Sequence, residues 1–82
     1  MYLIEFSKSA QNFFDKLPDK EANIIAKKID DLKEEPFRFL KRLQGEKLWR
    51  LRVGDYRAIV DVIISANKII VVRIGKRCNI YD

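Results

Sequence analysis

The spacing of apolar residues changes near Gly45, and this change constrains the fold more than any other feature of the chain. Upstream of Gly45, apolar residues recur mostly at intervals of three and four, the period of amphipathic helices. Downstream they alternate with charged residues, the period of strands with one buried face. The chain therefore predicts helices followed by strands.

The upstream part begins with an apolar run at residues 2–6, which predicts a strand ending at Ser7. Ser7 is placed to cap a first helix, and Pro18 interrupts that helix because proline is tolerated only in a first turn. A second helix should open at Pro18 or Asp19 and end before Pro36. Its predicted apolar stripe comprises Ala22, Ile25, Ala26, Ile29 and Leu32.

A connecting segment is expected up to Gly45, followed by strands over residues 47–53, 56–64 and 68–74 with turns between them. The predicted fold is α+β with the order βααβββ, in which an N-terminal strand and a helical hairpin pack on an antiparallel sheet. At 82 residues, the chain should form a single domain over residues 1–82.

The predicted sheet has one apolar and one basic face. Trp49, Leu51 and Val53 should pack beneath the helices against Phe13, Phe14, Ile25 and Ile29. Arg50 and Arg52 then lie on the opposite face. Arg57 and Arg73 join them if the strand register allows it, and Lys76 and Arg77 follow just beyond the last strand.

The excess of positive over negative charge lies in the C-terminal part of the chain. Residues 1–35 hold six Lys/Arg against eight Asp/Glu, whereas residues 36–82 hold eleven against four. This asymmetry is typical of a surface that binds a polyanion or an acidic protein, although a merely solubilising charge is the simpler alternative.

Several kinds of chemistry are disfavoured. The chain has no histidine and one cysteine, so no metal site, cofactor or disulfide framework is expected. Ser7 is a predicted cap, and Cys78 has no histidine base, which disfavours covalent catalysis. No apolar run is long enough to span a bilayer and no leader is apparent, so the cytoplasm is the expected location.

Arginine and tyrosine side chains suit phosphodiester cleavage, because guanidinium groups stabilise charge on phosphate oxygens and the 2′-hydroxyl of RNA can act as the nucleophile. Each also has a simpler interpretation. Arg57 could pair with Asp55 or Asp61, Tyr56 could be a packing aromatic, and Arg50 and Arg52 could be ordinary outward strand residues.

The run WRLRVGDYR at residues 49–57 resembles the central strand pair of the RelE/ParE toxin superfamily. The loop at residues 43–45 and the ending formed by Gly75, Lys76, Arg77 and Tyr81 resemble corresponding segments of RelE-type mRNA interferases. The resemblance extends over nearly the whole chain and implies a metal-independent endoribonuclease that cleaves mRNA in the ribosomal A site.

The resemblance also implies roles for individual residues. Arg57 would bind the scissile phosphate, Arg77 would neutralise the transition state or protonate the leaving oxygen, and Tyr81 would stack on a base and help activate the 2′-hydroxyl. Arg50 stands where relatives carry lysine, and Leu48 stands at a second basic position of theirs. The remaining candidate RNA contacts are Lys41, Arg42, Lys47, Arg52, Arg73 and Lys76.

The implied partners are the ribosome with its 16S rRNA, mRNA, and a RelB-type antitoxin that forms a heterotetramer of two toxins and two antitoxins. Two alternatives stay open. One is a ParE-type module that inhibits DNA gyrase without nuclease activity, and the other is a non-catalytic RNA-binding or antitoxin-scaffolding relative. The combination of Arg57, Arg77 and Tyr81 favours the ribonuclease.

Overall fold

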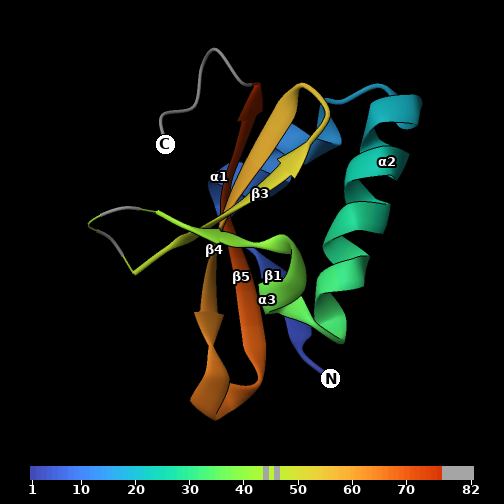
Figure 1. The fold of residues 1–82 in the computed structure, drawn as a ribbon. Helices are drawn as coiled ribbons and strands as arrows, with labels where there is room; N and C mark the ends of the chain where they lie inside the picture. Colours follow the sequence, from blue (N-terminus) through green and yellow to red (C-terminus); the bar gives the residue numbers. More distant parts are fainter. Residues whose placement is uncertain (44, 46, 77–82) are drawn as a thin grey trace.

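The computed structural model describes residues 1–43, 45 and 47–76. Figure 1 shows a twisted sheet with helices beside it. The elements, in chain order, are β1 (Leu3–Phe6), α1 (Lys8–Asp15), α2 (Asp19–Asp30), η1 (Asp31–Lys33), α3 (Pro36–Phe39), β2 (Lys41–Arg42), β3 (Trp49–Val53), β4 (Tyr56–Ile63), η2 (Ile64–Ala66) and β5 (Lys68–Lys76).

The sheet has the strand order β1-β5-β4-β3-β2. Strands β3, β4 and β5 form the predicted antiparallel meander. Strand β1 pairs with β5 in parallel, so the first and last strands of the chain are neighbours and the sheet is mixed. The sequence pattern predicted the strand at β1 but gave no indication of its partner, because that pairing joins distant parts of the chain.

Both long helices begin where their capping residues predict. The hydroxyl of Ser7 accepts a hydrogen bond from the amide of Ala10 at 3.1 Å and donates one to the carbonyl of Val72 at 2.6 Å. Ser7 therefore caps α1 and ties its start to β5. Helix α2 opens at Asp19 directly after Pro18, and its first turn carries acidic residues that complement the helix dipole.

The segment predicted as a plain connection between Pro36 and Gly45 contains two short elements instead. Pro36 occupies the first position of α3, where its missing N–H costs nothing, and β2 pairs antiparallel with β3. Elements of four and two residues are too short to produce a recognisable apolar period, which is why the sequence did not reveal them.

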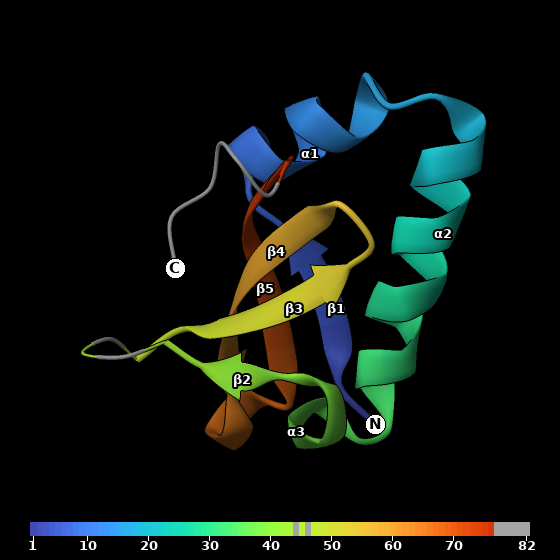
Figure 2. The ribbon, with the colours of Figure 1, turned by 45° about the horizontal axis from the view of Figure 1, so that its top comes forward.

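The core lies between the two helices and one face of the sheet. Ile25, Ile29 and Leu32 are buried against Leu51 and Val53, as the apolar stripe predicted, whereas Ala26 is exposed. The aromatic rings of Phe13, Phe14 and Trp49 pack at the margin of this core and are only partly buried. Figure 2 shows α2 running alongside the sheet while α1 crosses one end of it. Most of the candidate functional residues that the structure describes lie on the opposite face of the sheet.

Candidate nucleic-acid interface

The sheet face opposite the helices carries two cross-strand rows of basic residues. In the first row, Lys41 faces Arg50 and Arg50 faces Ile59, which in turn faces Arg73. In the second row, Arg52 faces Arg57, which faces Gly75. Directly opposed residues project to the same side of a sheet. We call this surface the arginine face, and it comprises Lys41, Arg50, Arg52, Arg57 and Arg73.

Strand alternation explains why these residues share a face. Leu51 and Val53 are buried on the helix side, so Arg50 and Arg52 must project to the other side. On β4, Ala58 and Val60 are buried in the same core, so Arg57 also projects away from it. The register therefore brings Arg57 and Arg73 to Arg50 and Arg52, as the sequence analysis expected if the register allowed.

Arg57 occupies the most enclosed position on the arginine face. Its side chain is half-buried, and its Nε atom is inaccessible to solvent. Arg52 borders it on one side, while Gly75 contributes no side chain on the other. Among the described residues, Arg57 therefore lies between the side chain of Arg52 and the backbone of Gly75.

A small apolar cluster lies among the arginines. Leu43 and Ile59 are buried together and Leu48 packs against them, although all three are on the side away from the main core. The amide of Leu43 donates to the carbonyl of Leu48 at 3.0 Å, which holds the two leucines together across the β2–β3 connection. The register places Ile59 directly between Arg50 and Arg73. The sequence analysis missed this cluster.

Toward its other end, the same sheet face carries acidic side chains together with a lysine. Asp61 lies four residues beyond Arg57 along β4, which separates the two Cα atoms by about 13 Å. Glu5 of β1 forms an ion pair with Lys68 at 3.1 Å. The face therefore has a basic end and a mixed-charge end. At this separation the geometry gives no support to the simpler interpretation that Arg57 pairs with Asp61.

Three predicted RNA contacts lie elsewhere. Arg42 pairs with Trp49 in the ladder and its guanidinium stacks on the indole ring at 5.3 Å, on the helix side of the sheet. Lys76 is inside β5 and not beyond it, and it lines a pocket with Glu21 and Tyr56 on the helix side. Neither side chain lies on the arginine face, and the prediction that Lys76 follows just beyond the last strand was wrong. Lys47 is exposed in the connection between β2 and β3.

Tyr56 packs edge-on against Phe13, with ring centroids 6.2 Å apart, in agreement with its simpler interpretation as a packing aromatic. Arg77 and Tyr81 lie outside the described residues, so their predicted roles are not placed by the structure. Within residues 1–43, 45 and 47–76, no three His, Cys, Asp or Glu side chains converge as metal ligands. No helix of that part is long and apolar enough to cross a membrane.

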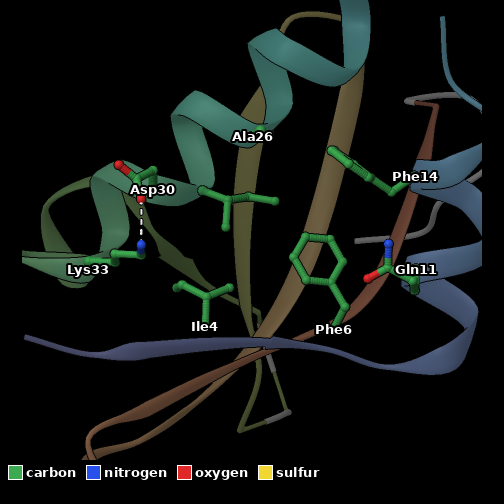
Figure 3. Close-up of a pocket in the computed structure, with 8 residues that line it drawn as sticks. Ile4, Phe6, Gln11, Phe14, Ala26, Asp30 and Lys33 are labelled. Atoms are coloured by element: carbon green, nitrogen blue, oxygen red, sulfur yellow. Dashed lines mark ion pairs between the residues drawn. The ribbon is translucent and has the colours of Figure 1, made fainter. Parts of the chain in front are cut away.

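A separate cavity of about 280 Å³ opens between β1, α1 and α2 (Figure 3). Ile4, Phe6 and Phe14 point into it, and the ion pair of Asp30 with Lys33, at 2.8 Å, lies at its rim. This cavity is on the helix side of the sheet. Its lining is mostly apolar, and it is separate from the arginine face.

Comparison with known proteins agrees with this architecture. The model of the family described as the ParE toxin of type II toxin–antitoxin systems matches residues 4–81. No curated protein matches the chain. Among solved structures, a chain of the RelBE2 toxin–antitoxin complex of Mycobacterium tuberculosis superposes with a TM-score of 0.84 at 25% identity, covering 93% of this chain and 98% of that one.

Two further structures give similar values. The archaeal RelE–RelB complex of Pyrococcus horikoshii matches with a TM-score of 0.82 at 26% identity, covering 96% of this chain and 98% of that one. The E. coli RelBE complex matches with a TM-score of 0.81 at 22% identity, covering 93% and 96%. The fold and its arginine face thus define a small basic toxin domain. The chain belongs to the ParE toxin family of type II toxin–antitoxin systems, within the RelE/ParE superfamily.

Proposed function

We propose that this toxin is a metal-independent endoribonuclease that cleaves mRNA in the ribosomal A site and so inhibits translation. The observation that carries the proposal is the convergence of Arg50, Arg52, Arg57 and Arg73 on one open sheet face. Such a surface suits a reaction in which negative charge builds on phosphate oxygens, because each guanidinium offers paired hydrogen bonds to them.

The reaction needs no nucleophile from the protein. The 2′-oxygen of the RNA attacks the adjacent phosphorus and loses its proton, while the bond from phosphorus to the 5′-oxygen breaks and that oxygen gains a proton. The products are a 2′,3′-cyclic phosphate and a 5′-hydroxyl. The protein must align the attacking and leaving oxygens and stabilise charge on the non-bridging oxygens, two contributions that suffice for large accelerations.

Within the described residues, Arg57 is best placed to bind the scissile phosphate because it is the most enclosed cation of the arginine face. Arg50 lies on a diagonal from it across the β3–β4 ladder, at about 7–8 Å between side-chain bases, and would contact an adjoining phosphate. A guanidinium group is a poor base, so Arg50 would stabilise charge and not accept the proton of the 2′-hydroxyl.

Arg77 and Tyr81 complete the proposed site by family resemblance. Arg77 would protonate the leaving 5′-oxygen or stabilise its charge, and Tyr81 would stack on a base next to the cleavage site and help to remove the proton of the 2′-hydroxyl. The ribosome would hold the message in register through contacts of its 16S rRNA with the basic surface. Activity on free RNA should therefore be weak.

A RelB-type antitoxin is the proposed regulator, and two copies of each protein would form the silenced complex. The similar structures of M. tuberculosis, P. horikoshii and E. coli are complexes of such toxins with antitoxins. An acidic segment of the antitoxin would be attracted by the same arginine face that binds RNA. Binding of antitoxin and RNA should then be competitive.

The second candidate function is inhibition of DNA gyrase without nuclease activity, and the family model that matches the chain favours it by name. By the resemblance, Leu48 stands where ribonuclease relatives carry a basic residue, which argues against nuclease activity and fits a non-catalytic relative. The two functions differ in their target, which is mRNA for a ribonuclease and DNA gyrase for the second candidate. A ribonuclease destroys message on purified ribosomes, where no gyrase is present.

The deciding experiment is in vitro translation on programmed ribosomes, with mRNA ends mapped by primer extension for the wild type and Arg77→Ala. We expect wild-type cuts at the A-site codon that disappear in the variant. Intact message together with inhibition of gyrase supercoiling would establish the second candidate instead. Intact message without gyrase inhibition would favour a non-catalytic RNA-binding protein.

A further inference from the structure

The corner of the molecule at α3 carries a cluster of aromatic rings and arginines. The ring of Phe37 lies 4.9 Å from that of Trp49, between centroids. The guanidinium of Arg42 stacks on Trp49 at 5.3 Å, and that of Arg38 lies 5.6 Å from the ring of Phe39. We call these five side chains, from α3, β2 and β3, the α3 corner.

The aromatic rings of the α3 corner are unusually accessible. Phe37 is 44% exposed and Phe39 is 38% exposed, and Trp49 is half-buried. The exposure follows from the shortness of α3, which is a single turn and cannot bury both of its phenylalanines against the core. Grouped aromatic residues at a surface mark sites of interaction, because their exposure to water is unfavourable.

The α3 corner adjoins the arginine face across strand β2. Lys41 faces Arg50 and belongs to the arginine face, whereas its neighbour Arg42 faces Trp49 and belongs to the corner. Because β2 is the edge strand of the sheet, nothing in the ladder lies beyond it. A chain lying across the arginine face can therefore pass over this edge and reach the aromatic rings.

We propose that the α3 corner binds unpaired RNA bases by stacking, next to the phosphates held on the arginine face. This inference rests on the proposed RNA substrate and adds a second contact outside the catalytic groups. Bases stack on aromatic rings and on arginine planes, and the corner presents both. Arg57 on β4 and the edge strand β2 are two strand spacings apart, about 10 Å, and the rings of the corner lie next to that edge on the helix side of the sheet.

The charges around the α3 corner permit an anionic ligand. Arg38 pairs with Glu35 at 3.7 Å, but both side chains are largely exposed, at 71% and 65%. An exposed pair of this length contributes little to stability, so Arg38 is available to a phosphate at small cost. The guanidinium groups on the ring faces favour RNA over an apolar protein segment, which would have to displace or desolvate them.

Trp49 is the only tryptophan of the chain, so its fluorescence reports on this corner alone. The probe is a mixed-sequence octanucleotide with 2′-O-methyl groups, which blocks attack by the 2′-oxygen. Inorganic polyphosphate of equal charge is the control without bases. We expect the oligonucleotide to quench Trp49 while polyphosphate leaves its emission unchanged.

The variant is Phe39→Ala, with Phe37→Ala added in a second protein. Each ring should cost about tenfold in oligonucleotide affinity by fluorescence anisotropy, the range expected for one stacked base. The matched control is Leu3→Ala with Ile64→Ala, because these residues are also exposed and apolar, at 66% and 63%, but lie outside the corner. Thermal unfolding of every variant checks that it is folded.

Four results would overturn the inference. The first two are an oligonucleotide that does not bind and one that binds without changing Trp49 emission. The other two are equal quenching of Trp49 by polyphosphate and unchanged oligonucleotide affinity in a folded Phe39→Ala protein. Failure of the proposed function has a different signature. In that case programmed ribosomes retain intact message while oligonucleotide still quenches Trp49, and the corner stands as an RNA-binding site of a non-catalytic protein.

Discussion

Arg52 and Arg57 lie directly opposite each other across the β3–β4 ladder, so two like charges face one another on the same side of the sheet. Like charges in opposed positions destabilise a sheet. A phosphate bound between them would relieve this repulsion. The pairing is therefore unfavourable for the isolated fold and favourable for binding of a polyanion.

Replacing Arg52 should separate these two effects. We expect Arg52→Gln to raise the free energy of unfolding by a few tenths of a kcal/mol up to about 1 kcal/mol, because one like-charge contact is removed. The same variant should bind RNA more weakly, and the slope of log affinity against log salt should fall by about one. Chemical denaturation and anisotropy titrations at several salt concentrations measure both quantities.

The matched control is Lys27→Gln on α2, an exposed cation on the helix side of the sheet. It should leave the salt slope nearly unchanged. A loss of stability in Arg52→Gln, or equal slopes for the two variants, would contradict the view that Arg52 serves binding at the expense of the fold.

The contribution of Arg57 to mRNA cleavage should depend on its planar guanidinium and not only on its charge. We expect Arg57→Lys to lower the rate of mRNA cleavage on programmed ribosomes about a hundredfold, since an ammonium cannot form the paired hydrogen bonds to a phosphate. Arg57→Ala should lower it at least as far. Both proteins should keep a wild-type thermal midpoint within a few degrees, and wild-type cleavage by Arg57→Lys would remove Arg57 from the site.

Ser7 should contribute more to stability than its place at the surface suggests. We expect Ser7→Ala to cost about 1–3 kcal/mol, because it removes the α1 cap and leaves the Val72 carbonyl without its partner. Ser9→Ala, at an exposed position within α1, should be neutral or slightly stabilising. Urea denaturation compares the two, and equal effects would show that the tie to β5 is unimportant.

By the resemblance, Leu48 stands at a basic position of the relatives, and replacing it with lysine tests the effect of a basic group there. It lies two residues before Arg50 on the arginine face, so Leu48→Lys should place an ammonium beside the bound phosphate and raise the cleavage rate. We expect a stability cost of about 1 kcal/mol, because the lysine stem keeps part of the contact with Leu43 and Ile59. The control is Leu48→Met, which conserves volume and adds no charge. Lower activity in Leu48→Lys than in Leu48→Met would contradict the prediction.

Local signals in the sequence predicted much of the fold. The cap at Ser7, the break at Pro18 and the change of period after Gly45 located the long helices and the three meander strands. The same alternation predicted that Arg50 and Arg52 face away from the core. These features depend on neighbours in the chain, which a single sequence displays.

Features that depend on distant neighbours were not predictable in this way. The parallel pairing of β1 with β5 joins segments more than sixty residues apart. Strand β2 forms by pairing with the edge of β3. The position of Lys76 on the helix side follows from its register with Tyr56, which the turn alone does not set. The cluster of Leu43, Leu48 and Ile59 depends on the hydrogen bond between Leu43 and Leu48 and on the pairing of β3 with β4.

The location of β5 between β1 and β4 also determines at which point of synthesis the sheet of this toxin can be completed. The hydroxyl of Ser7 donates a hydrogen bond to the carbonyl of Val72, 65 positions later, and β1 pairs with β5, so this pairing can form only once residues 68–76 have been made. Such a high contact order delays closure of the sheet until the final strand leaves the ribosome. A chain that lacks β5 lacks Arg73 and the strand that pairs with Arg57, so the arginine face is complete only once β5 has joined the sheet.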